Sequence, residues 1–188
     1  MNRLPTSRRT AWRLATATLL IASAGWLTAC ASGPKPADYA AEKPVLDLAT
    51  YFNGPLVAHG LFTDRSGKVV KRFTVKMVGT WTGNRGVLEE DFTYSDGTLQ
   101  RRVWRLQKQA DGRYTGEADD VVGGAVGQAA GNALNWRYTM ALPVDGKVWE
   151  VQFDDWMYLM DEKVMLNKAV MSKFGITLGE VTLSFYKP

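Results

Sequence analysis

Apolar and polar residues alternate along most of the chain from about residue 45 onward, as they do in strands with one buried face. One face of the segment 134–142 carries Leu134, Trp136, Tyr138, Met140 and Leu142. Segments 73–81 and 149–157 alternate in the same way. Turn signals, most of them Asp-Gly pairs, recur about every ten residues between such segments, and this spacing predicts an antiparallel meander.

Residues 45–188 are therefore expected to form one all-β domain of about eight or nine strands. Closure into an up-and-down antiparallel barrel would bury one face of every strand and protect all edges. Barrels of about this size can hold one small ligand, as lipocalins do. A two-sheet sandwich is the alternative architecture.

The first 29 residues predict a bacterial signal peptide, with four arginines and no acidic residue ahead of an apolar stretch. The stretch is shorter than the ~20 residues of a membrane-spanning helix. The sequence Leu27-Thr28-Ala29-Cys30 then resembles the lipobox of bacterial lipoproteins. This resemblance implies acylation of Cys30, and Ala31 favours sorting to the outer membrane, on its periplasmic face. A plain secretory signal is the alternative. Residues 30–44 are expected to form an extended tether.

The charge of the predicted mature chain is balanced. The whole chain has 23 Lys and Arg against 19 Asp and Glu, and the four arginines of the signal peptide account for the difference. Without a basic surface, nucleic acid is not an expected partner. Cys30 is the only cysteine, so an intramolecular disulfide is excluded.

One predicted hairpin, residues 86–107, carries charge on its inward face. Glu90 shares the parity of the apolar residues on its strand. A two-residue turn would place Arg101 and Arg105 diagonally beside Glu90, whereas a three-residue turn would place Arg102 opposite it. One interpretation is an ion pair that fixes the register and binds nothing, since an isolated buried charge is costly. The other is that Arg102 receives the headgroup of an acidic amphiphile.

The predicted ligand site is an apolar pocket inside the barrel. Its expected lining is Trp104, Trp136, Tyr138, Trp149 and Phe153, with Glu90 and Arg102 as the polar end. Asp155 is expected to point inward, and its neighbour Asp154 outward, so these two carboxylates are not placed to act as an acid/base pair on one bond. The alternative is that both lie at the barrel rim.

A run of Gly and Ala at residues 123–131 separates two predicted strands. Gly123, Gly127 and Gly131 recur at steps of four, but the run is too short to span a bilayer and has no dinucleotide-binding fingerprint. We expect a flexible or partly helical connector. A lid over the barrel mouth, or a patch that meets a membrane or partner, are the alternatives.

Enzyme and metal signatures are mostly absent from the sequence. His59 is the only histidine and lacks ligands at zinc spacing. Asp119 and Asp120 do not form a calcium loop, and neither a nucleophile elbow nor a P-loop is present. No metal or cofactor is expected, and an enzymatic role is disfavoured.

The chain as a whole resembles the bacterial lipoprotein family known as domain of unknown function 3833. The likeness rests on segments such as "YFNGPLVAHG", "LEEDFTYSDGTLQRRVWRL", "GGAVGQAAGNALNWRY" and "FDDWMYLMDE". The resemblance implies no assigned catalytic residues, and it favours lipid because genes of the family often lie beside those of acyl-modifying enzymes. The expected function is binding of a fatty acyl chain or lipid. An envelope scaffold with a packed core and an unknown protein partner is the alternative, and an acyl-modifying enzyme is the third.

Overall fold

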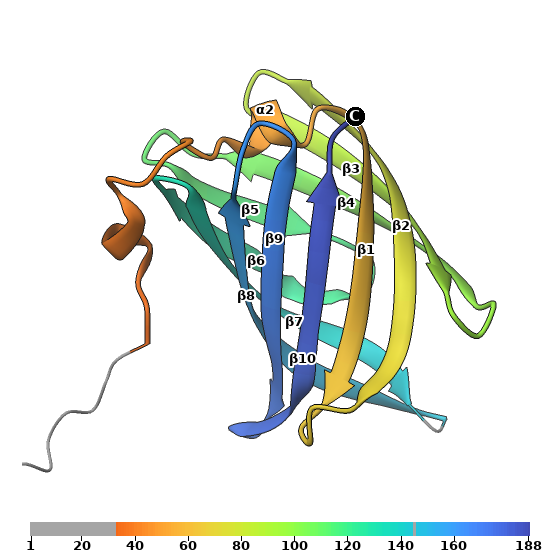
Figure 1. Cartoon of the computed structure of the whole chain (residues 1–188). Coiled ribbons are helices and arrows are strands. Elements are labelled where there is room, and N and C mark those ends of the chain that lie inside the picture. Colours follow the sequence, from red (N-terminus) through yellow and green to blue (C-terminus); the bar gives the residue numbers. More distant parts are fainter. Residues whose placement is uncertain (1–32, 145) are drawn as a thin grey trace, which may run out of the picture. The chain divides into compact units, whose positions relative to one another are not determined.

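Ten antiparallel strands follow one another along the chain and close into a barrel (Figure 1). They are β1 (Gly54–Asp64), β2 (Val69–Thr82), β3 (Arg85–Tyr94), β4 (Leu99–Lys108), β5 (Arg113–Glu117), β6 (Val121–Ala130), β7 (Ala133–Val144), β8 (Lys147–Leu159), β9 (Val164–Lys173) and β10 (Ile176–Tyr186). This computed structural model describes residues 33–144 and 146–188, so the predicted signal peptide and Cys30 lie outside the described residues. No helix in the described ranges has both the length and the hydropathy of a membrane span.

Each strand pairs with its neighbours in sequence, and β10 pairs with β1 to close the ring. The predicted all-β, up-and-down barrel is therefore confirmed, and the alternative of a sandwich is wrong. The barrel has ten strands rather than eight or nine. Predicted turns such as those around Gly67 and Gly97 do connect strands, and both glycines have a positive φ that other residues rarely adopt.

The expectation that the Gly/Ala-rich run forms a flexible or partly helical connector is wrong. Up to Ala130 the run belongs to strand β6. Gly123 and Gly124 have φ values of 70° and 83° and coincide with a break in the register between β6 and β7. Gly127 packs directly against the indole of Trp136. A Cβ at this position would lie only 2.3 Å from a ring carbon, so a larger residue would not fit. The small residues thus let a bulky ring lie close to the barrel wall.

One end of the barrel is covered, and we call it the closed end. The short helix α2 (Leu48–Tyr51) lies across this end, at the top of Figure 1. Buried side chains of α2 and of Phe52 join the main hydrophobic core. The opposite end, which carries the β1–β2, β3–β4 and β9–β10 turns, is called the open end.

The segment before α2 differs from the expected extended tether. Lys35–Pro188 forms one compact unit, and residues Pro36–Tyr39 form a 3₁₀ helix, η1. The ring of Tyr39 packs against Trp156 and Tyr158, with ring centroids 5.7 and 5.3 Å away. From Lys35 onward the predicted tether is therefore part of the barrel unit.

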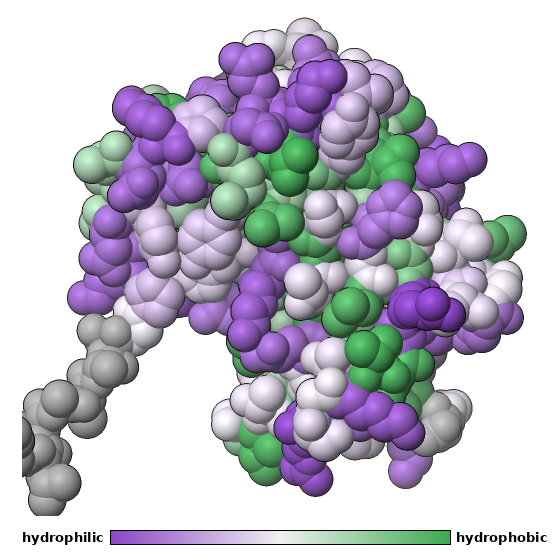
Figure 2. Space-filling view, in the orientation of Figure 1, coloured by the Kyte–Doolittle hydropathy of each residue, from purple (hydrophilic) through white to green (hydrophobic). Residues whose placement is uncertain are grey.

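The outer surface alternates in character, as expected for strands with one face in solvent. Figure 2 shows hydrophobic residues lying between hydrophilic ones on the face that carries β9, β10 and β1. Exposed apolar side chains gather at strand starts and turns of the open end: Val69, Leu99, Val148, Phe174 and Ile176. The open end thus combines access to the interior with an apolar edge.

Candidate functional site

The interior of the barrel contains a cavity of about 690 Å³. Ligand pockets in proteins measure roughly 300–1,000 Å³, so its size suits a small molecule. Most of its lining is apolar and includes side chains from both ends of the barrel, such as Phe52 near α2 and Val144 at the open end. Most of its buried polar groups gather at two places, one around Arg102 and one around Asp155.

The hairpin of β3 and β4 places the first polar group. The two strands pair in the register Glu90 to Arg102, which the three-residue turn at residues 95–97 requires. Of the two registers left open by the sequence, this one is confirmed. The alternation of the strands then turns both side chains inward, and Glu90 is only 9% exposed.

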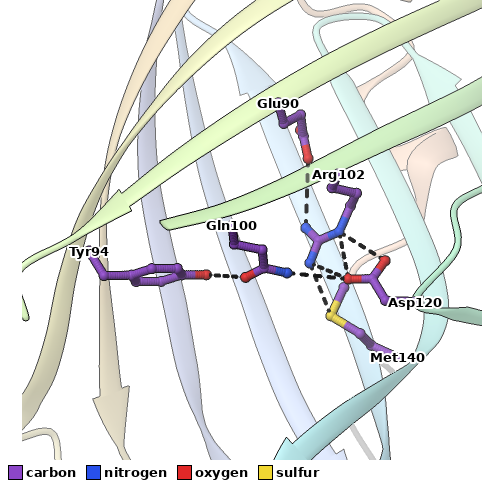
Figure 3. Close-up of polar contacts among 6 residues, drawn as sticks. All are labelled: Glu90, Tyr94, Gln100, Arg102, Asp120 and Met140. Atoms are coloured by element: carbon purple, nitrogen blue, oxygen red, sulfur yellow. Dashed lines mark hydrogen bonds and ion pairs between the residues drawn. The ribbon is translucent and has the colours of Figure 1, made fainter. Parts of the chain in front are cut away.

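Arg102 is held mainly by Asp120, a residue of the loop between β5 and β6 (Figure 3). Its Nε donates to both carboxylate oxygens at 3.1 and 3.0 Å, and its Nη2 donates to Oδ2 at 2.8 Å. Nη2 also contacts the Met140 sulfur at 3.3 Å, and the guanidinium lies 5.2 Å from the ring centroid of Phe92. By contrast, Glu90 Oε2 is 3.6 Å from Arg102 Nη1, which is too long for a hydrogen bond.

The polar network continues from Asp120 toward the open end. Gln100 donates to Asp120 at 3.5 Å and accepts a hydrogen bond from Tyr94 Oη at 2.7 Å (Figure 3). We call Glu90, Tyr94, Gln100, Arg102, Asp120 and Met140 the Arg102 cluster. Its members come from β3, β4, the β5–β6 loop and β7, so it ties one side of the barrel together.

The charges in this cluster act on each other. Burial raises the pKa of Glu90 to about 7, although the positive charge of Arg102 opposes this shift. For Arg102, burial alone would lower the pKa, but the carboxylates of Glu90 and Asp120 outweigh it and raise the pKa. Arg102 therefore stays charged, whereas Glu90 takes up a proton near neutral pH.

The second polar group is on β8 and β9. Asp155 is 6% exposed, and its carboxylate accepts a hydrogen bond from the side-chain amide of Asn167, which is 3% exposed. The same amide nitrogen donates to the backbone oxygen of Trp156 at 3.1 Å. Burial raises the pKa of Asp155 to about 7, and the charges of Asp154 and Glu90 add to this effect while the Asn167 hydrogen bond opposes it.

An aromatic wall lies between the two polar groups. Trp104 packs edge-on against Trp136 and Tyr138, with centroids 5.8 and 5.5 Å away, and Tyr138 stacks on Phe153 at 4.8 Å. These four predicted residues line the cavity, together with Glu90, Arg102 and Asp155. Trp149 does not, and it lies partly exposed at the start of β8 beneath the Lys173 ammonium.

A family model described as "Protein of unknown function (DUF3833)" matches residues 24–187. The chain belongs to this family. Comparison with curated protein sequences finds no match for this DUF3833 member.

Solved structures with similar folds exist at low sequence identity. The S-type phycobiliprotein lyase CPES from Guillardia theta is 5% identical, with a TM-score of 0.52 over 72% of this chain and 88% of that chain. A fluorescence-activating β-barrel designed de novo is 14% identical, with a TM-score of 0.40 over 76% of this chain and 99% of that chain. The likeness to the lyase concerns the barrel fold alone.

Five residues of the site are not among the predicted site residues: Tyr94, Gln100, Asp120, Met140 and Asn167. The sequence singles out Asp120 only as a calcium candidate that lacks a calcium loop. Its loop position gives no parity with which to predict an arginine partner. Asn167 does have a signal, since it alternates with buried Met165 and Ala169 along β9. Within the described residues no group of three or more His, Cys, Asp and Glu is placed to hold a metal ion.

The three glycines that the sequence suggests as a possible lid lie in or next to a paired strand. Gly123 and Gly127 lie within β6, and Gly131 lies in the turn before β7 with its backbone close to the Tyr39 carbonyl oxygen. Both neighbouring strands hydrogen bond to β6 over part of its length. A hinged segment over the barrel mouth would need a backbone free of such pairing.

Proposed function

We propose that this protein is a lipoprotein of the bacterial outer membrane that binds a hydrophobic ligand, a fatty acyl chain or lipid, inside its barrel. The observation that carries the proposal is the cavity of about 690 Å³, which has aromatic and aliphatic walls and two buried polar groups. An apolar cavity with a few placed polar groups is the usual form of a small-molecule site. The scaffold alternative requires a packed interior, which a cavity of this size argues against.

The chemistry of the walls supports an acyl chain. Met77, Leu88, Met140, Met171 and Leu183 are among the aliphatic lining residues, and flexible methionines adapt to a flexible chain. Each methylene moved from water into such a cavity contributes about 0.8 kcal/mol. A long alkyl chain therefore gains enough from burial to bind without a covalent bond.

A ligand-binding assay tests the proposal with the full chain carrying Cys30→Ser, which removes the predicted acylation site. Native mass spectrometry should find co-purified lipid. Added alkyl amphiphiles should change the total Trp fluorescence of the chain, because Trp104 and Trp136 lie at the cavity wall. Glu150→Gln, on the outward face of β8, serves as a control for indirect effects. Neither bound lipid nor any saturable fluorescence change with alkyl amphiphiles would reject the proposal.

Membrane anchoring is tested separately. Cells fed a labelled fatty acid should incorporate the label into the wild-type chain and not into Cys30→Ser. Fractionation should place the wild type with outer membranes and release the variant into the soluble fraction. Equal labelling of both chains would reject acylation at Cys30 and leave ligand binding to be judged on its own assay.

A further inference from the structure

The cavity contains more acidic than basic groups. Glu90, Asp120 and Asp155 line it, and the guanidinium of Arg102 lies beside Glu90 and Asp120. Lys71 also reaches the lining near the open end, but its ammonium is 3.0 Å from the carboxylate of Asp96. A ligand that carried a carboxylate into this interior would bring a fourth acidic group to a site with three, and above about pH 7, where Glu90 and Asp155 are ionised, it would add to an excess of negative charge.

Among the described residues, Arg102 is the cation best placed to receive an acidic headgroup, and Asp120 already occupies it. Three contacts of 2.8–3.1 Å join the guanidinium to that carboxylate. Both side chains are partly or largely buried, and removing one partner from such a pair leaves a costly unpaired charge. Receiving a ligand carboxylate at Arg102 would require this pair to loosen.

Two buried oxygen atoms of the lining lack hydrogen-bond partners among the described residues. They are Glu90 Oε2 and Asn167 Oδ1, on residues that are 9% and 3% exposed. Both belong to side chains that line the cavity. A buried acceptor without a hydrogen-bond partner destabilises the folded state, so a ligand that donates a hydrogen bond to either atom offsets that cost.

The acceptors come from opposite walls. In the ring of ten strands, β3 with Glu90 and β8 with Asp155 are five positions apart, and β9 with Asn167 is next to β8. Their carboxylates nevertheless sense each other, since the charge of Glu90 helps to raise the pKa of Asp155. A polar group in the cavity between these walls is therefore within the electrostatic influence of both carboxylates.

We infer that the polar end of the ligand is a hydrogen-bond donor without negative charge, a primary amine or a hydroxyl, held by Glu90 and the Asp155–Asn167 pair. This inference rests on the proposed binding function and specifies its ligand class. The aromatic wall supports it, because faces of Trp and Tyr rings attract an ammonium group. The buried carboxyls support it further, since a bound ammonium stabilises their ionised form.

The experiment compares three probes with the same alkyl chain on the full chain carrying Cys30→Ser: dodecylamine, dodecanol and dodecanoate. Trp fluorescence titrations at about pH 8 keep both carboxyls largely ionised. We expect the amine and the alcohol each to bind at least about tenfold more tightly than dodecanoate, a difference of about 1.4 kcal/mol. Dodecanoate binding as tightly as either would overturn the inference while the binding function stands. Binding by none of the three would reject the binding function and the inference with it.

Two variants locate the polar end. Asp155→Asn removes a charge inside the cavity, and it should narrow the ratio of amine to dodecanoate affinity by several-fold. Glu150→Gln removes a charge from the exposed face of the same strand, and it should leave the ratio unchanged. An unchanged ratio in Asp155→Asn, with the fold verified by circular dichroism, would contradict the assigned position of the ligand's polar end.

Discussion

The two ends of the barrel are built in contrasting ways. At the closed end, Asp47 caps α2 by accepting from the backbone N–H of Thr50 at 2.9 Å, and the same carboxylate pairs with Lys108 of β4. Lys187 near the C-terminus donates to the carbonyl oxygens of Thr50 and Tyr51 at 2.7 and 3.0 Å. Helix, sheet and C-terminal segment are thus tied together over the core.

The open end has no such cover among the described residues. Its turns and strand starts expose apolar side chains instead, with Phe174 88% and Leu99 75% exposed. Phe174 also has a φ of 52°, which is unfavourable for a residue other than glycine. The closed end therefore contributes to stability, whereas the open end leaves the cavity accessible. Substitutions at the closed end should lower the free energy of unfolding, and substitutions at the open end should change it little.

The largest expected effect comes from a matched pair of phenylalanines. Phe52→Ala should lower the free energy of unfolding by about 3–5 kcal/mol, because its ring is 4% exposed and packs against Phe185. Phe174→Ala should change it by no more than about 0.5 kcal/mol. Urea unfolding followed by circular dichroism measures both. Equal losses in the two variants would mean that the ends do not differ in stability.

A change of pH should affect stability with opposite signs through the cavity carboxyls and through Asp47 at the closed end. Glu90 and Asp155 have folded pKa values of about 7, above their ordinary values, so their contribution is complete below about pH 4 and is lost as the pH rises through 7. The loss is about 2 kcal/mol for each carboxyl between pH 5 and 8. Thermal unfolding across this range checks the slope, which should flatten in Glu90→Gln and Asp155→Asn. A melting temperature that rises with pH in the wild type would contradict it.

Asp47 at the closed end provides the opposite sign. Burial raises its pKa, but the hydrogen bonds from Lys108 and Thr50 outweigh burial, and the net effect is a lowered pKa. Its contribution is therefore present above the ordinary pKa of 3.8 and is lost as the pH falls through the lowered value. Asp47→Asn should remove this acid-side loss without changing the slope near pH 7.

An alanine-to-phenylalanine substitution at two buried positions distinguishes the packed core from the empty cavity. Ala58→Phe, at a position that is fully buried in the main core and does not line the cavity, should destabilise the protein by about 1–3 kcal/mol. Ala169→Phe projects into the cavity and should cost less, but it should weaken ligand binding at least about tenfold. Unfolding and probe titrations on both variants test this. Undiminished binding in Ala169→Phe would place the ligand outside the cavity.

The smallest expected effect concerns the cap of α2. Asp47→Ala removes both the acceptor for the Thr50 N–H and the partly exposed partner of Lys108, and should cost about 1–2 kcal/mol in all. Ligand affinity should stay unchanged, because Asp47 does not line the cavity. A loss of affinity larger than the loss of stability would link the two ends and weaken the contrast.

Much of the barrel is predictable because alternation and turn chemistry are local properties. The Asp-Gly turn after Tyr94 and the inward parity of Glu90 lead to the observed pairing with Arg102 once the turn length is known. Strand β6 is not predictable in this way. Its Gly and Ala residues have little intrinsic preference for strands, and pairing along part of β5 and β7 holds them extended.

Parity also has a limit at the site. Trp149 shares the inward parity of Val151 and Phe153, but it lies at the start of β8 near the open end. Alternation reports which face a side chain takes, and it says nothing of the height along the barrel axis. The pairing of Asp120 with Arg102 cannot be predicted for a related reason. Asp120 lies in a loop, and its position depends on how the strands on both sides of that loop are arranged.

The pairing of β10 with β1 joins residues such as Val57 and Tyr186, which are the most distant partners in the sheet. During synthesis every other pairing joins strands adjacent in the chain, so a growing meander can assemble progressively as it emerges. The wall stays incomplete until the final strand arrives. A hydrophobic ligand can therefore be enclosed only after β10 has been synthesised and paired with β1. A polypeptide truncated before β10 should expose its apolar inner face to chaperones or proteases.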